Sequence, residues 1–104
     1  MNPPPKTLDL LARRIMRAAE EDLRHWLGIA QLDHELLGEL YIRVRETLER
    51  CPMTDRADVE ELALTIYLTA SAWQSKSEAP VELLLSLHQV IERTLSLKVS
   101  RIAP

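Results

Sequence analysis

Apolar residues recur every three or four positions through most of this chain, and this is the spacing of amphipathic α-helices. Residues that begin or end helices divide the pattern into four segments. Gly28 is expected to close the first segment, Asp33 to cap the second, and Pro52 to stop the second. Either Thr54 or Asp55 can cap the third. The predicted helices cover residues 7–28, 33–51, 54–73 and 77–102.

The links between these segments are only a few residues long, so consecutive helices are expected to lie side by side and run in opposite directions. We therefore predict an all-α fold, a four-helix antiparallel bundle with up-down-up-down topology. Residues 1–6 are expected to be a flexible, Pro-rich N-terminus, followed by a single helical domain at residues 7–104. The side chains expected to face inward are, in chain order, Leu8, Leu11, Ile15, Ala19, Leu23, Trp26, Leu37, Leu40, Tyr41, Val44, Leu48, Cys51, Val59, Leu62, Ala63, Ile66, Ala70, Trp73, Val81, Leu84, Leu85, Ile91, Leu95, Val99 and Ile102.

The fourth predicted helix carries more apolar residues than one inward stripe can use. Leu83, Leu87, Val90 and Leu97 form a second line, and the two lines together cover roughly two-thirds of the helix circumference. Because a helix in a bundle of four normally shows one side to water, this second line predicts a contact with another chain. We expect a homodimer first, and second a partner helix in a groove between the third and fourth helices. The alternative is a central helix covered by the other three.

Three polar residues fall inside the predicted core stripes and suggest a different function. Asp22 lies in the stripe of the first helix, and His88 and Glu92 lie in that of the fourth. In an antiparallel pair of these helices Asp22 comes level with His88, so we expect a hydrogen bond between them or a water-filled notch. The alternative function is a ligand- or metal-binding bundle that uses this interior cluster, although no paired metal-ligand motif supports a metal.

The stretch HWLGIAQLDHELLGEL, residues 25–40, raises the possibility of DNA binding, because two helices joined by a tight turn also form a helix-turn-helix. Its second helix would present Glu35 and Glu39, which repel phosphate. The net charge of −3 gives no basic footprint either. We therefore interpret the stretch as a structural corner, expect no nucleic acid partner, and regard a DNA-binding regulator as less favoured.

Motifs for catalysis are not found in the sequence. There is no Gly-rich phosphate loop, no HExxH or CxxC, and no serine with a visible base. The single cysteine, Cys51, is expected at a helix C-terminus, where the helix dipole disfavours a thiolate, and we interpret it as a core residue. No enzyme activity, cofactor or metal is expected.

The cellular location follows from equally simple features. One cysteine cannot form an intrachain disulfide, the start of the chain lacks a signal-peptide pattern, and no uncharged stretch is long enough to cross a bilayer. We expect a cytoplasmic protein without membrane contact. Taken together, the patterns predict a non-enzymatic protein–protein interaction module, which includes a small adaptor, a regulator or inhibitor, or a chaperone.

Overall fold

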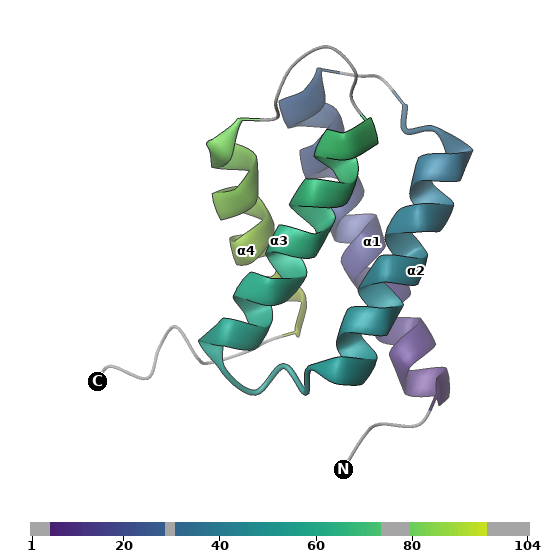
Figure 1. Ribbon diagram of the computed structural model, residues 1–104, viewed down its shortest axis with the longest axis vertical. Helices are drawn as coiled ribbons and strands as arrows, with labels where there is room; N and C mark the ends of the chain where they lie inside the picture. Colours follow the sequence, from purple (N-terminus) through teal and green to yellow (C-terminus); the bar gives the residue numbers. More distant parts are fainter. Residues whose placement is uncertain (1–4, 29–30, 74–79, 96–104) are drawn as a thin grey trace.

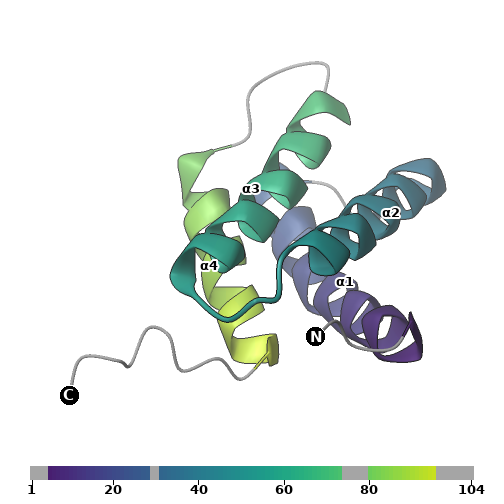
Figure 2. The same ribbon diagram turned by 60° about the horizontal axis from the view of Figure 1, so that its bottom comes forward.

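The computed structural model describes residues 5–28, 31–73 and 80–95, and within them it contains four α-helices and no strand. Residues 1–4 of the expected flexible N-terminus lie outside this description. The helices are α1 (Pro5–Leu27), α2 (His34–Arg50), α3 (Arg56–Trp73) and α4 (Val81–Leu95). Consecutive helices run in opposite directions (Figure 1), and α4 returns to pack against α1. The predicted up-down-up-down bundle is therefore confirmed, with α1 and α2 on one side and α3 and α4 on the other (Figure 2).

The ends of α1 and α2 are set by local sequence. α1 begins at Pro5, slightly before the predicted Thr7, because a proline in the first turn removes only an N–H that has no helical acceptor. Gly28 ends α1 in the left-handed conformation, with φ of 68°, as predicted. The Asp33 carboxylate accepts a hydrogen bond from the Glu35 N–H at 2.7 Å, which confirms its role as the cap of α2.

The turn between α2 and α3 combines polar caps with one buried side chain. The Asp55 carboxylate accepts a hydrogen bond from the Asp58 N–H at 3.0 Å, so Asp55 is the cap of α3. Asp58 in turn accepts from the Thr54 N–H at 3.2 Å. Met53 adopts a left-handed φ of 57° and is nevertheless buried. Burial of its side chain therefore offsets the roughly 1–2 kcal/mol that a left-handed backbone costs a residue with a Cβ atom.

α4 begins at Val81, and Pro80 lies immediately before the helix rather than in its first turn. The Pro80 carbonyl accepts a hydrogen bond from the Leu83 N–H at 3.0 Å. A residue without an N–H suits this boundary, where an amide would have no helical acceptor. Both predicted ends of the fourth helix, Ser77 and Ile102, lie outside the described residues.

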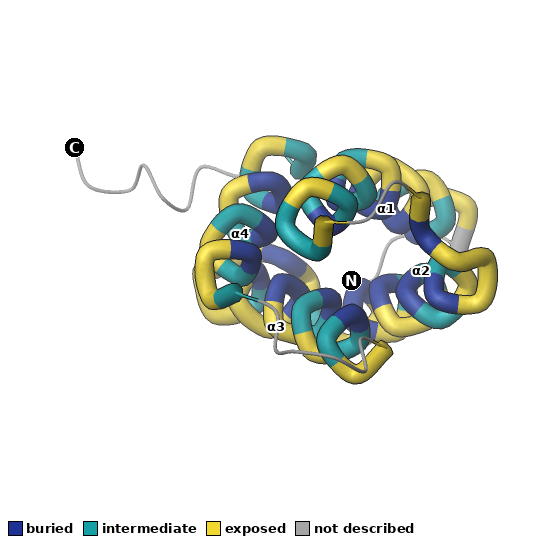
Figure 3. The backbone as a smooth tube through the Cα atoms, turned by 90° about the horizontal axis from the view of Figure 1, so that it is seen from above, coloured by how far each residue is buried: buried dark blue, intermediate teal, exposed yellow. Residues whose placement is uncertain are grey.

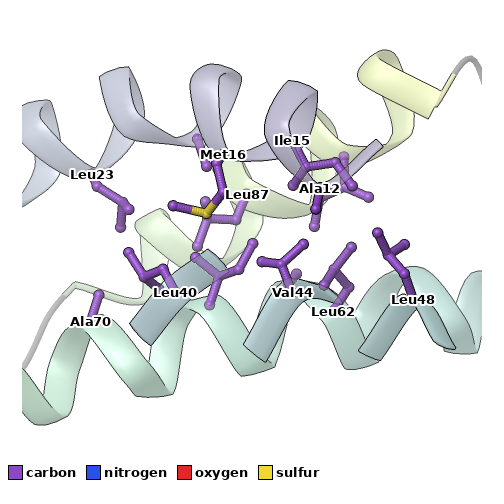
Figure 4. Packing of buried hydrophobic residues seen from close by; sticks show 14 of the residues in the cluster. Ala12, Ile15, Met16, Leu23, Leu40, Val44, Leu48, Leu62, Ala70 and Leu87 are labelled. Carbon is purple, nitrogen blue, oxygen red and sulfur yellow. The ribbon is translucent and has the colours of Figure 1, made fainter. Parts of the chain in front are cut away.

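The core fills the space between the four helices, and buried positions face inward all round the bundle (Figure 3). Side chains from all four helices interdigitate there, among them Ile15, Leu40, Leu62 and Leu87 (Figure 4). Each large aliphatic side chain contributes roughly 1.5–3 kcal/mol by leaving water, so this cluster is the main source of stability. The large side chains with the least exposure are Ile15, Leu23, Leu40, Leu62, Ile66, Leu83, Leu87, Ile91, Val44, Val59 and Thr47.

Most of the predicted inward positions on α1, α2 and α3 are buried, and the differences lie at the edges of the stripes. Near the start of α2, Leu36 is buried, whereas the predicted core residue Leu37 is only half-buried. Thr47 is also buried, and its hydroxyl donates a hydrogen bond to a backbone carbonyl one turn earlier. Trp73 is 44% exposed, because it is the last residue of α3 and lies beyond the final buried residue of that helix, Ala70.

The side of α4 that faces the core differs from the predicted one. Leu83 and Leu87 are completely buried in the single chain, and Val90 is nearly so. The prediction that these residues form an exposed line for a partner is therefore wrong for the three of them. Leu97, the fourth member of that line, lies beyond the last residue that the structure describes.

The other apolar line of α4 faces outward in part. Val81 and Leu85, predicted as core, are 64% and 62% exposed. Because α4 packs against both α1 and α3, the arc that faces the space between these two helices is the one that becomes buried. This arc is rotated from the predicted one by about 100°, the angle between successive residues of a helix.

Candidate functional site

The predicted interior cluster of Asp22, His88 and Glu92 is not assembled in the structure. Asp22 faces α4, but its carboxylate accepts a hydrogen bond from the Ser86 hydroxyl at 2.5 Å instead of pairing with His88. His88 lies on the other flank of α4, beside α3. The predicted Asp22–His88 pairing is therefore wrong. The two residues are at similar heights, but positions 86 and 88 project about 200° apart around a helix, and Ser86 is the one that faces α1.

His88 and Glu92 remain close because they are one helical turn apart. The His88 Nδ1 atom lies 3.8 Å from Glu92 Oε2, and the contact is an ion pair only when the imidazole is protonated. The two side chains are only 18% and 16% exposed. The Nε2 atom of His88 is buried without a hydrogen-bond partner among the described residues. These two residues form a polar pair between α3 and α4.

Asp22 instead borders a notch between α1 and α4 with a volume of about 450 Å³. A notch of this kind was the other outcome expected for this carboxylate. The lining residues are Ala18, Glu21, Asp22, His25, Val90, Arg93 and Thr94. Within the part of the chain that the structure describes, no three His, Cys, Asp or Glu side chains are grouped so that they could hold a metal ion. The ligand- or metal-binding alternative thus loses the cluster on which it depended.

The stretch at residues 25–40 forms a corner between two antiparallel helices (Figures 1 and 2). Gly28 closes α1 and Asp33 opens α2, while residues 29–30 lie outside the description. The His25 ring packs edge-on against Trp26, with ring centroids 5.1 Å apart. Two neighbouring helices that run in opposite directions form an αα-hairpin, in agreement with the structural interpretation of this stretch.

Cys51 follows α2 as its C-terminal cap and packs against the core. Its position agrees with the interpretation as a core-packed residue. Burial raises the pKa of the Cys51 thiol, and the negative charge of Asp58 raises it further. The direction is the one expected from sequence, and burial is its largest cause. A thiol with a raised pKa forms little thiolate at neutral pH and is a poor nucleophile.

Exposed apolar side chains gather on α3 and α4. Seven large apolar residues are exposed in the described part of the chain, and five of them belong to these two helices. The remaining two, Leu10 and Ile42, stand singly on α1 and α2. Isolated exposed apolar side chains are common on protein surfaces, so the five on α3 and α4 are the more informative set. We call this set the α3–α4 face: Leu64, Leu68, Trp73, Val81 and Leu85.

A groove of about 550 Å³ lies within this face, between α3 and α4. Its apolar lining comes from Ala63 and Leu64 on α3 and from Leu84 and Leu85 on α4. The polar lining consists of Arg56, Glu60, His88, Gln89 and Glu92. We call this feature the α3–α4 groove.

A second groove, of about 460 Å³, lies on the other side of α3, towards α2. Leu68 and Trp73 contribute apolar surface to it, and Glu39 and Arg43 of α2 line its far wall. The outer ridge of α3, with Leu64 and Leu68 one turn apart, therefore stands between two grooves. This ridge continues the apolar surface from one groove to the other.

The helices that carry the α3–α4 face are also acidic. α3 and α4 together hold two arginines against five carboxylates, with histidine counted as neutral. α1 and α2 hold eight basic residues against eight acidic ones, so that half of the bundle is balanced. The five carboxylates are Asp58, Glu60, Glu61, Glu82 and Glu92. Of these five carboxylates, Glu60 and Glu92 line the α3–α4 groove, together with Arg56.

Sequence reasoning placed Leu84 and Leu85 in the core and so missed them as groove residues. One signal was available: α3 carries no charged residue from Leu62 to Trp73, although part of that segment faces outward. A helix with an uncharged outer side is unusual when that side is only solvated. A second signal lay on α4, because His88 and Glu92 interrupt the line that contains Leu84 and Leu85, whereas the line of Leu83, Leu87 and Val90 holds no charged residue.

The chain matches no protein-family model, no curated protein and no solved structure. Across residues 5–28, 31–73 and 80–95, none of the helices combines the length and the apolarity needed to span a bilayer.

Proposed function

We propose that this protein is a non-enzymatic protein–protein interaction module that binds its partner through the α3–α4 face. The observation that carries the proposal is the gathering of exposed apolar side chains on two adjacent helices beside a partly apolar groove. Burial of apolar area is favourable by roughly 25 cal/mol per Å², so covering the face would contribute to the free energy of binding a partner. An adaptor, a regulator or inhibitor, and a chaperone all fit such a surface.

We therefore assign partner binding to the accessible residues of the α3–α4 face rather than to the buried line of α4. Leu83 and Leu87 belong to the core beneath, and Val90 faces the notch between α1 and α4. Leu64 and Leu85 are the accessible leucines of the α3–α4 groove, at 41% and 62% exposure. A second copy of the chain and a different protein are both compatible with this role. The cytoplasmic location stays a prediction, and fractionation of host cells would test it.

Crosslinking in the protein's own host tests the proposal. A photoreactive amino acid at Gln89, an exposed residue of the groove, should give a discrete crosslinked product. The product should vanish in the double variant Leu64→Ser/Leu85→Ser, which removes apolar surface without adding charge. The matched control is Leu10→Ser/Ile42→Ser, whose leucine and isoleucine are also exposed but lie on α1 and α2.

Both double variants should lose less than about 1 kcal/mol of unfolding free energy per substituted residue, because the substituted side chains are 41–64% exposed. Loss of the product can then be assigned to the surface rather than to unfolding. A product of equal strength from the α3–α4 variant, or its loss from the α1–α2 control alone, would contradict the proposed function.

A further inference from the structure

We propose that the occupant of the α3–α4 groove is an amphipathic helix of a different protein, with apolar side chains on one face and Lys or Arg beside them. This inference rests on the proposed function and specifies its partner. It follows from the shape of the groove and from the charges at its edge.

The shape suits a helix. The groove runs between two neighbouring antiparallel helices, and its volume of about 550 Å³ has room for several side chains. Leu64 stands on one wall, and Leu84 and Leu85 stand on the other. An amphipathic helix presents apolar side chains three and four positions apart, in a single row that can enter such a groove.

The edge of the groove offers carboxylates to basic side chains. Glu60 is paired with Arg56 at 3.5 Å, and both side chains are mostly exposed, at 59% and 70%. Exposed pairs one helical turn apart are weak, so a cation of the partner can replace or share this contact. Glu92 lies at the other wall, and its ion-pair partner is His88, which is charged only when protonated. A basic residue of the occupant would therefore meet two carboxylates whose existing ion pairs are weak.

The same charges disfavour a second copy of the chain. A symmetric dimer places identical patches against each other. Two copies of the α3–α4 groove would bring together two linings that each carry Arg56 against Glu60 and Glu92. Like charges across an interface oppose binding, whereas a basic helix removes the imbalance. Charge complementarity thus favours a heterologous basic partner over the homodimer.

Two synthetic peptides test the inference directly. One is an 18-residue amphipathic helix with Leu at positions three and four apart and Lys on its polar side, and its twin carries Glu in place of each Lys. Fluorescence anisotropy at low salt should show the Lys peptide bound at least about tenfold more tightly than the Glu peptide. The difference should shrink when salt is raised, because exposed charges are screened.

Variants of the protein locate the peptide and separate apolar from charged contributions. Leu64→Ser/Leu85→Ser should weaken the Lys peptide by about tenfold or more, because it removes both accessible leucines of the groove. Glu60→Gln/Glu92→Gln should weaken it by a few-fold and reduce its salt dependence. Leu10→Ser/Ile42→Ser, on α1 and α2, should leave it unchanged.

Several results would overturn the inference while leaving the proposed function intact. A Glu peptide that binds as tightly as the Lys peptide contradicts the charge argument. A Lys peptide that is insensitive to Leu64→Ser/Leu85→Ser occupies another surface, and failure of both peptides to bind shows that the groove does not take a helix. A wild-type dimer in sedimentation that dissociates in Leu64→Ser/Leu85→Ser assigns the groove to a second copy. The proposed function fails separately, through the crosslinking experiment.

Discussion

The α1–α2 half and the α3–α4 half of this bundle share one core but treat their outer surfaces differently. α1 and α2 alternate basic and acidic residues on their outer sides, and each exposes a single large aliphatic residue, Leu10 or Ile42. α3 and α4 bury one apolar line and expose another. The outer surface of the first half is therefore mainly charged, whereas that of the second half contains exposed apolar side chains. Exposed apolar surface is thus concentrated on one half of the bundle, and this is the half to which we assign partner binding.

The two halves also differ in the polar contacts between their two helices. Between α1 and α2, the Tyr41 hydroxyl donates a hydrogen bond to Asp9 Oδ1 at 2.7 Å, and Arg45 Nε lies 3.1 Å from the same oxygen. Between α3 and α4 lies the groove, which has leucines on both walls. A shared carboxylate ties the first pair together across its surface. The second pair leaves a space that another side chain can enter.

The largest expected effect separates the two apolar lines of α4. Leu87→Ala should destabilise the protein by about 3 kcal/mol, since it leaves a cavity at a fully buried site. Leu85→Ala, two residues away, should change stability by less than about 0.5 kcal/mol, because that side chain is 62% exposed. Urea unfolding of both variants measures the difference. Equal losses would show that α4 does not have distinct inner and outer faces.

The two glycines test how far local conformation governs the α1–α2 half. Gly28 has φ of 68°, so Gly28→Ala should destabilise by about 1 kcal/mol through backbone strain alone, since nothing lies near the added Cβ atom. Gly38 lies in the exposed middle of α2 with open space around it. Gly38→Ala should therefore stabilise by roughly 0.5–1 kcal/mol. Thermal unfolding should move the two melting temperatures in opposite directions, and a shift of both in the same direction would contradict the assignment.

A smaller effect is expected from the contact between α1 and α2. Tyr41→Phe should cost about 1 kcal/mol, because it removes a partly buried hydrogen bond to a carboxylate without changing the packing of the ring. Glu39→Gln is the control on the same helix. It weakens the exposed Arg43–Glu39 pair and should cost less than about 0.5 kcal/mol. Equal losses of unfolding free energy from Tyr41→Phe and Glu39→Gln in denaturant would show that the Asp9 contact does not distinguish this half of the bundle.

The smallest effect concerns Cys51, at the junction of α2 and α3. Because burial and the charge of Asp58 raise the pKa of its thiol, alkylation by iodoacetamide should be slower in the native protein than in the urea-unfolded chain. The pH–rate profile should be displaced to higher pH, and Asp58→Asn should move it part of the way back. The raised pKa of the thiol contributes stability fully below the unfolded pKa, and this contribution is lost as pH rises through the folded pKa. A pH–rate profile of the native protein that coincides with that of the unfolded chain would contradict a raised pKa of the Cys51 thiol.

The number of helices, their order and most of their ends could be predicted from the sequence, because the signals are local. Gly28 and Asp33 act on amides within a few residues, and short links make neighbouring helices antiparallel. The inward stripes of α1 and α2 were also predictable in large part, since charged residues mark their outer sides. The sequence by itself thus determined a four-helix bundle and the solvated face of its first half.

Only the tertiary structure decided how α4 is rotated. His88 and Glu92 interrupt only the line of Leu85, but the rotation itself depends on packing against α1 and α3 at once. The same rotation turns Ser86 rather than His88 towards Asp22. The candidate site followed from this one angle, because it buries the line that was expected to bind a partner and opens the groove on the other flank.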